Sequence, residues 1–258
     1  MSNEEAGAII TPRQRAPNTP PARRSREDRP AVKNSELVYR HLRREIVGMV
    51  LPPGTPILEK DIAQSHGVSR TPVREAVLRL VEERLVEVVA KSGTYVSRIP
   101  LSVLPEALVA RRALEAVTVR EAARIATPSR ITGLVSLVQL QQERAEAGDE
   151  EGFHEADDAF HAAIAEAARY SGIWDLVQQV KVHVDRYRRL TLPQPGRMGR
   201  VVDEHNAIVE AIRRQDPALA ERRMEDHLNK LRLDIAIFRD MWPDYFIHDI
   251  AHDEERLR

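Results

Sequence analysis

The stretch GVSRTPVREAVLRL, residues 67–80, decides how the N-terminal part of this chain folds. Pro72 has no backbone N–H, so a helix tolerates it only in its first turn. Ser69 or Thr71 can cap that turn. Apolar side chains then recur at helical spacing, at Val73, Ala76, Val77, Leu80 and Val81. The pattern predicts a helix that begins here and runs to about Arg84.

Two arginines stand one turn apart at the start of this predicted helix, Arg70 and Arg74. A helix N-terminus already carries a positive partial charge, so acidic side chains would stabilise it better. The arrangement is explained if an anionic partner meets that end. The alternative is a solvated helix end with no partner.

The neighbouring segments extend the pattern on both sides. They are an amphipathic helix at 35–48, a turn at LPPGTPI (51–57), a short helix at 59–65 that His66-Gly67 ends, and a β-hairpin at 85–99 around Ser92-Gly93. The order of helix, helix, tight turn, helix and hairpin predicts a winged helix-turn-helix. The second helix of such a turn enters the major groove of double-stranded DNA.

Composition limits the class of protein. The 258 residues suffice for two domains, and the absence of cysteine excludes disulfides and thiolate metal sites. No apolar run is long enough to cross a membrane, and no signal peptide is evident, so we expect a cytoplasmic protein. Residues 1–99 hold 17 Lys and Arg against 12 Asp and Glu, whereas residues 100–258 hold 22 against 28. A basic part suits nucleic acid, and an acidic part suits a separate task.

The expected fold class is mainly α, with an N-terminal winged helix-turn-helix followed by an antiparallel all-helical bundle. The predicted divisions are a disordered basic and proline-rich arm at 1–33, the DNA-binding domain at 34–99, the helical domain at 100–241 and a C-terminal tail at 242–258. The expected bundle helices lie near 101–126, 129–147, 150–169, 172–191, 197–214 and 216–241.

Three stretches of the acidic part carry candidate metal ligands: DDAFHAAI (157–164), DEHNAIVEAI (203–212) and RRMEDHLNKL (222–231). Asp157 and His161 are four residues apart and share a helix face. His205 and His227, like His161, lie at the edge of apolar stripes. One carboxylate and three imidazoles pointing into a bundle suit a divalent transition metal. A single histidine at such an edge is more often a packing residue. The metal-site hypothesis therefore depends on all four residues together.

The N-terminal residues closely resemble the DNA-binding domain of the GntR family of bacterial transcription regulators. The proline and glycine after the first helix, the GVSRTPVREAVLRL core and the SGTYV wing all match. The resemblance implies a homodimer on a near-palindromic operator. It also implies DNA contacts from Lys60, Ser69, Arg70, Thr71 and Arg74, with Gly93 at the wing tip.

The acidic part resembles the FCD ligand-binding domain of the FadR-like subfamily, through Asp-x3-His and two further histidines 44 and 22 residues on. The resemblance implies that Asp157, His161, His205 and His227 bind Zn, Ni or Mn. It also implies that Arg111, within ARRALEAV (110–117), faces the cavity and holds a ligand carboxylate bidentately. The alternative for this arginine is a surface position beside Arg112.

The leading functional hypothesis is a ligand-responsive regulator, by default a repressor, that senses a small carboxylic acid. A second hypothesis makes the metal purely structural. A third, a metalloenzyme, lacks a His-Glu-x-x-His motif and a general base beside the ligands. One predicted helix fits either a pocket lining or a solvated face at Arg186, Tyr187, Arg188 and Arg189. His154 and His183 have no motif support, and we expect them at surface or packing positions.

Overall fold

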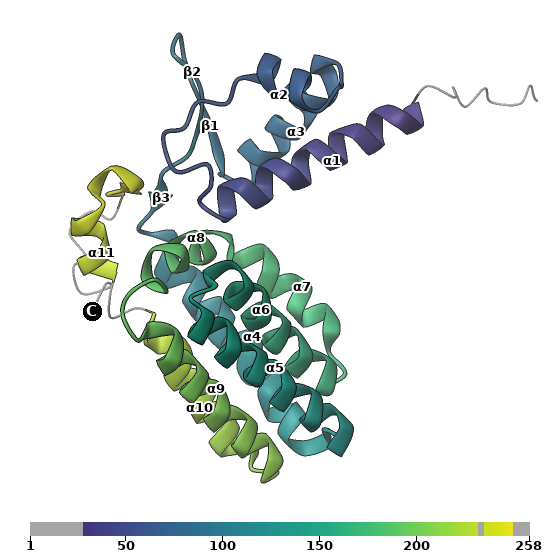
Figure 1. The fold of residues 1–258 in the computed structure, drawn as a ribbon, viewed down its shortest axis with the longest axis vertical. Helices are drawn as coiled ribbons and strands as arrows, with labels where there is room; N and C mark the ends of the chain where they lie inside the picture. The colour runs from purple at the N-terminus through teal and green to yellow at the C-terminus, as the bar shows by residue number, and fades with distance from the viewer. Residues whose placement is uncertain (1–27, 232–234, 250–258) are drawn as a thin grey trace, which may run out of the picture.

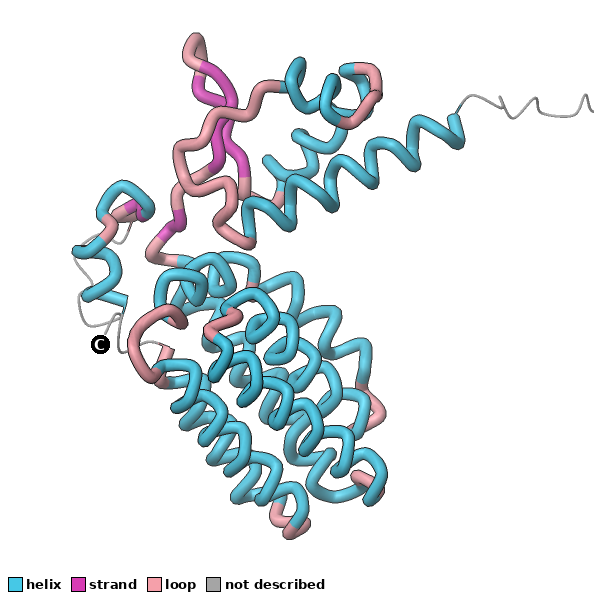
Figure 2. Tube along the Cα trace, viewed as in Figure 1, coloured by secondary structure: helices cyan, strands magenta, loops and turns pink. Residues whose placement is uncertain are grey.

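The computed structural model describes residues 28–231 and 235–249 and consists of two helical units (Figure 1). The N-terminal unit contains α1 (Asp28–Val47), α2 (Glu59–Ser65), α3 (Arg70–Glu82), β1 (Val86–Val89) and β2 (Gly93–Val96). The C-terminal unit is a helical bundle, and the strands of the described residues lie in the wing and at the junction (Figure 2). The predicted mainly-α fold with a winged helix-turn-helix ahead of a bundle is confirmed. Most of the predicted arm, residues 1–27, lies outside the described residues.

The helix that opens at Arg70 forms because its apolar stripe packs on α1 and α2. Four of the five predicted stripe residues are buried, and Val81 is partly buried. Gly67 adopts φ +63°, a left-handed conformation that suits glycine, and so makes the tight turn before α3. Ser69 is the N-cap residue, but its side chain accepts no capping hydrogen bond. The predicted capping role of the Ser69 hydroxyl is therefore wrong, and the hydroxyl stays exposed.

The wing is an antiparallel hairpin in which Val86 pairs with Val96 and Val89 with Gly93. Gly93 has φ +150°, and a Cβ there would lie 3.3 Å from Tyr95 Oη. Both the backbone angle and the close tyrosine therefore favour glycine at the tip.

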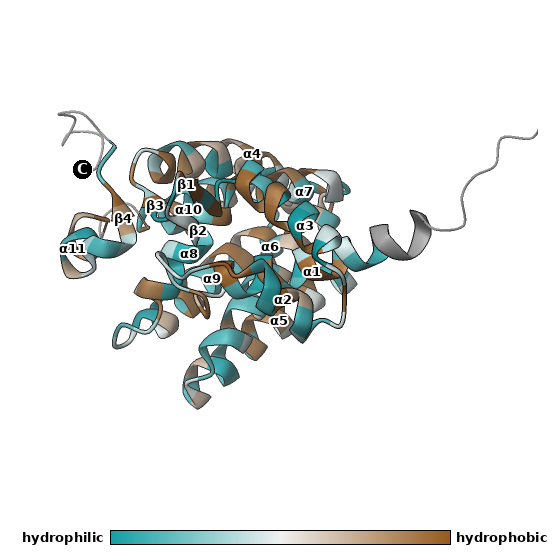
Figure 3. Cartoon of the chain, turned by 90° about the horizontal axis from the view of Figure 1, so that it is seen from above, coloured by the Kyte–Doolittle hydropathy of each residue, from teal (hydrophilic) through white to brown (hydrophobic). Residues whose placement is uncertain are grey.

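The bundle consists of α4 (Val103–Ile125), α5 (Pro128–Ala147), α6 (Glu150–Ala167), α7 (Ser171–Val180), α8 (Val182–Thr191), α9 (Arg197–Arg213) and α10 (Pro217–Asn229). Three starts are capped as the sequence suggests: Thr127, Asp149 and Asp216 each accept a hydrogen bond from a first-turn backbone N–H. Brown apolar segments alternate with teal polar ones around the helices (Figure 3), as amphipathic packing requires. Among the described residues, no helix is both long and apolar enough to span a membrane.

Two predicted helices are each divided in the structure. The segment predicted as 172–191 forms α7 and α8, with a break at Lys181, whose ammonium is buried between Asp158 and Asp185. No glycine or proline marks this break, so the tertiary ion pairs decide it. The segment predicted as 216–241 forms α10 and α11 (Ile235–Met241), and residues 232–234 lie outside the described residues.

The chain closes on itself at the junction between the two units. Strand β3 (Ile99–Pro100) pairs in parallel with β4 (Phe246–Ile247), which follows the short 3₁₀ helix Pro243–Tyr245. Asp249 accepts hydrogen bonds from the backbone and the hydroxyl of Ser102. The predicted tail therefore packs, as far as it is described, against the linker that leaves the wing.

Candidate metal centre

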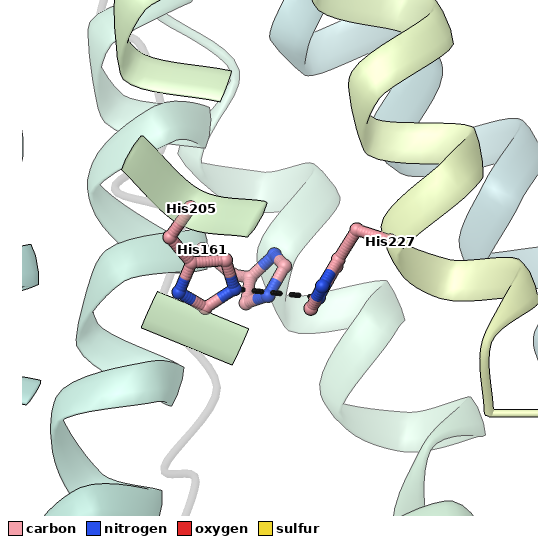
Figure 4. A group of neighbouring side chains, drawn as sticks. All are labelled: His161, His205 and His227. Carbon is pink, nitrogen blue, oxygen red and sulfur yellow. Dashed lines mark hydrogen bonds between the residues drawn. The ribbon is translucent and has the colours of Figure 1, made fainter. Parts of the chain in front are cut away.

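Three helices bring the predicted histidines together. His161 lies on α6, His205 on α9 and His227 on α10, and one ligand atom of each lies within 4.8 Å of the others. All three side chains are buried. Figure 4 shows the three imidazole rings turned toward one another from separate helices. The bundle therefore converts widely spaced sequence positions into one cluster.

Each imidazole has a carboxylate or amide oxygen close to its Nδ1. Glu115 of α4 lies 2.5 Å from Nδ1 of His161, Gln141 of α5 lies 2.7 Å from Nδ1 of His205, and Glu204 of α9 lies 2.7 Å from Nδ1 of His227. The Gln141 amide nitrogen donates to the Ala156 carbonyl, so its oxygen faces the histidine. An acceptor at Nδ1 favours the tautomer that carries its proton there, which leaves the Nε2 lone pair for a metal ion.

The Nε2 atoms of His205 and His227 face each other. Nε2 of His205 and Nε2 of His227 are 3.3 Å apart. Ligands about 2.0–2.1 Å from a tetrahedral metal are separated by roughly 3.4 Å, so the spacing fits a shared ion. The buried Nε2 of His161 has no hydrogen-bond partner among the described residues. A polar atom buried without a partner is costly, and a cation between the three rings would satisfy it.

The fourth predicted ligand, Asp157, lies beside this cluster and is hydrogen-bonded to an arginine. Asp157 Oδ1 is 3.9 Å from Nε2 of His205, and Oδ2 is 4.0 Å from Nε2 of His161. Both oxygens also accept hydrogen bonds from Arg188, at 2.7 and 2.6 Å. Burial by itself raises the pKa of Asp157, but the charge and hydrogen bonds of Arg188 outweigh it and hold the pKa well below its usual range. Each carboxylate oxygen has a second lone pair, so Asp157 can face an ion and Arg188 together.

The electrostatics of the centre suit a cation. Burial lowers the pKa of His205 and, less strongly, of His227, so both rings are neutral and available as ligands at neutral pH. Burial also raises the pKa of Glu115, but Arg111 and His161 more than offset it and the net pKa is low. The centre therefore combines neutral imidazoles with ionised carboxylates.

Arg111 lies inside the bundle. Its side chain is 1% exposed, and its Nε donates to Glu115 Oε1 at 2.7 Å. The alternative of a surface position is therefore wrong, because Arg112, which contacts Asn229, is the outward neighbour. Arg111 is joined to the histidine cluster through the carboxylate of Glu115.

Sequence reasoning missed three residues that contact the candidate ligands, Glu115, Gln141 and Glu204, and left Arg188 as either a pocket-lining or a solvated residue. Glu204 directly precedes His205, and that proximity was a usable signal. The contact of Gln141 could not be predicted, because a polar residue in an amphipathic helix is normally expected to face solvent. Arg186, Tyr187 and Arg188 are buried, so the solvated-face interpretation is wrong for them, whereas Arg189 is partly exposed.

A groove of about 650 Å³ between α9 and α10 reaches the outer side of the centre. His227 and Glu204 lie in its wall. Its basic residues are Arg197, Arg200, Arg223 and Lys230, and its other acidic residues are Asp203 and Asp226.

The residues expected to contact DNA lie at the other end of the molecule. All six are exposed: Lys60, Ser69, Arg70, Thr71, Arg74 and Gly93. Within residues 28–231 and 235–249, no acidic group pairs with the three cations among them. The start of α3 therefore presents unneutralised positive charge.

Each of the two units matches a known protein family. Residues 34–96 match the bacterial regulatory proteins of the gntR family, and residues 106–230 match the FCD domain. The chain is 31% identical over 212 residues to the HTH-type transcriptional repressor RspR of Escherichia coli, covering 82% of this chain and 93% of that protein. It is 33% identical over 218 residues to an uncharacterised HTH-type transcriptional regulator of Streptomyces ambofaciens, covering 84% and 92%.

The fold agrees with a solved structure as well. E. coli McbR/YncC superposes with a TM-score of 0.67 at 23% identity, over 81% of this chain and 98% of that one. The family and these relatives are transcription regulators rather than enzymes, which excludes the metalloenzyme hypothesis. The chain is a DNA-binding transcription regulator that belongs to the GntR family, with an FCD domain after its winged helix-turn-helix.

Proposed function

We propose that this regulator is a repressor that senses a small carboxylic acid through a metal ion in its bundle. The observation that carries the proposal is the histidine cluster, in which one ring nitrogen of each of three buried imidazoles lies within 4.8 Å of the others. A carboxylate or amide oxygen also lies close to each Nδ1. Packing alone does not require three buried imidazoles from three helices to meet. Zn, Ni or Mn would be held by His161, His205 and His227, with Asp157 as the fourth ligand.

A bound ion of this kind supplies a Lewis-acidic position that a ligand carboxylate can occupy. The groove between α9 and α10 supports an acid as the ligand, because four cations line it and one histidine of the centre lies in its wall. Arg111 is the candidate second contact for the carboxylate. Its bond to Glu115 keeps its guanidinium oriented within the bundle.

The proposed DNA contacts are Lys60, Ser69, Arg70, Thr71 and Arg74, with Gly93 at the wing tip. The exposed cations at the start of α3 suit phosphates and guanine edges. A homodimer on a near-palindromic operator would place two such helices in successive major-groove faces. Repression is the proposed sign, since the relative RspR is named a repressor.

The test is the melting temperature of protein loaded with Zn²⁺, Ni²⁺ or Mn²⁺, measured against a panel of hydroxy, keto, dicarboxylic and sugar acids. An acid at 100 times its dissociation constant stabilises by about 2.7 kcal/mol, or about 2–4 °C for a chain of this size. We expect such a shift from at least one acid. It should disappear in His205→Ala and Arg111→Ala and persist in His41→Ala, a histidine of α1.

Two results would contradict parts of the proposal. If chelation lowers the melting temperature but no acid raises it, the metal is structural and the acid is not the effector. If neither metal nor chelator changes the melting temperature, the cluster is not a metal site.

A further inference from the structure

Helix α8 contacts α1 of the N-terminal unit, β3 at the junction, and α4 and α7 of the bundle. Val182 at its start belongs to the hydrophobic core of the winged helix-turn-helix. Val184 and Tyr187 belong to the cluster at the junction, together with Ile99 of β3 and Phe246 of β4. In Figure 1, α8 lies at the end of the bundle that faces the N-terminal unit. One short helix thus bridges the two units.

The bundle side of α8 is attached to the metal centre. Arg188 donates two hydrogen bonds to Asp157, the predicted ligand on α6. The next residue of α6, Asp158, pairs with the buried Lys181 at the start of α8, at 2.9 and 3.0 Å. α8 is therefore tied to α6 near both of its ends, so a shift of the Asp157 carboxylate is transmitted to the helix.

The opposite side of α8 is attached to the wing. Arg186 is fully buried, and its Nη2 donates to the Ser97 carbonyl at 2.5 Å. Ser97 directly follows β2, and its own N–H donates to the Leu85 carbonyl ahead of β1. The Arg186 contact therefore reaches the base of the hairpin, where both strands meet the linker.

Burying the Arg186 guanidinium at this position costs desolvation energy that its hydrogen bond to the Ser97 carbonyl does not fully offset. Its Nε and Nη1 are buried without hydrogen-bond partners among the described residues. Burial lowers its pKa to about 10, which still leaves it charged at neutral pH. An apolar side chain of similar volume would avoid the cost of desolvating a cation. Packing and stability alone therefore do not account for an arginine at this position.

The two arginines point in opposite directions because they are two residues apart on one helix, or about 200° around its axis. We propose that α8 couples the metal centre to the DNA-binding domain, with Arg188 sensing the Asp157 carboxylate and Arg186 positioning the base of the wing through Ser97. This inference rests on the proposed metal function. It assigns Arg186 a regulatory role that involves no contact with metal, effector or DNA.

The test is amide hydrogen exchange followed by mass spectrometry on the full chain, with and without the ion that stabilises it most among Zn²⁺, Ni²⁺ and Mn²⁺. In the unaltered protein, the ion should protect α6, α9 and α10 and should also change exchange in residues 85–99. In Arg186→Met, protection of the bundle should remain while the change at the wing is lost. Arg186→Lys, which keeps a donor, should restore part of the wing response.

Arg189→Met is the matched control, because Arg189 lies on the same helix and pairs with Glu151 instead. It should keep both responses. Arg188→Met removes the hydrogen bonds to Asp157 and should also abolish the response of the wing to metal. If the wing still responds to metal in Arg186→Met and in Arg188→Met, α8 is not the coupling element.

The remaining outcomes separate this inference from the function on which it rests. Bundle protection without any wing response in the unaltered protein overturns the coupling but leaves the metal site intact. No bundle protection with any of the three ions overturns the metal site, and the coupling falls with it.

Discussion

At the scale of single residues, the centre depends on acceptors that would not themselves touch the ion. Glu204 holds Nδ1 of His227 and also accepts from Lys230 at 2.9 Å. Glu204→Gln replaces a charged acceptor by a neutral amide, so the histidine becomes a weaker ligand. We expect metal affinity, measured by competition with a chelator, to fall about 10–100-fold. Glu210→Gln on the same helix is the control, and equal affinities in the two variants would contradict the assignment.

A second residue-scale prediction concerns pH. Burial, with help from Arg186 and Arg84, lowers the pKa of His183 to about 4, against 6.5 for the ordinary side chain. Between these values the unfolded chain binds a proton that the folded chain does not, so His183 costs stability as pH falls from about 6.5 to 4. The slope from one group is at most about 1.4 kcal/mol per pH unit. Urea unfolding should show a shallower loss over this range in His183→Gln, and an unchanged slope would refute the prediction.

At the scale of elements, α3 is the candidate DNA-recognition helix. Arg70→Ala and Arg74→Ala should each weaken DNA binding and reduce the slope of log affinity against log salt by about 1 if the lost contact is to a phosphate. A smaller change in slope with relaxed sequence preference would indicate a base contact instead. Fluorescence anisotropy on duplex DNA across a salt series distinguishes these outcomes.

Arg213→Ala on α9 is the control for α3, because Arg213 lies in the bundle and pairs with Glu210. Its affinity and slope should match those of the unaltered protein. If the α3 variants behave like this control, the exposed cations of α3 are only a solvated helix end.

At the scale of the whole molecule, the proposed dimer can be measured directly. Sedimentation should give a mass about twice the 29.3 kDa of one chain. The half-sites that it protects should lie about 34–36 Å apart or at a multiple of that distance, since two recognition helices must meet successive turns of the duplex. A monomer at micromolar concentration, or protection of a single half-site, would contradict the dimer.

The sequence by itself determined the local elements and the family. The stripe from Val73 to Leu80, with Gly67 ahead of it, sets α3 and its turn, because helical period and left-handed backbone are local properties. The helical period of apolar residues does not predict burial where tertiary contacts decide which of them are covered. In the amphipathic first helix, Leu37 is 64% exposed while its neighbour Val38 is 1% exposed, because packing buries only part of a broad apolar face.

Only the tertiary structure decided how the centre is completed and connected. The histidines proposed as ligands were visible in the sequence because each lies beside an apolar stripe. Their acceptors Glu115 and Gln141 come from other helices, and no spacing rule relates residues that meet only when helices pack. The break at Lys181 and the burial of Arg186 and Arg188 likewise depend on partners far along the chain. Propensity is a property of short segments, whereas the pairing of buried charges is a property of the packed bundle.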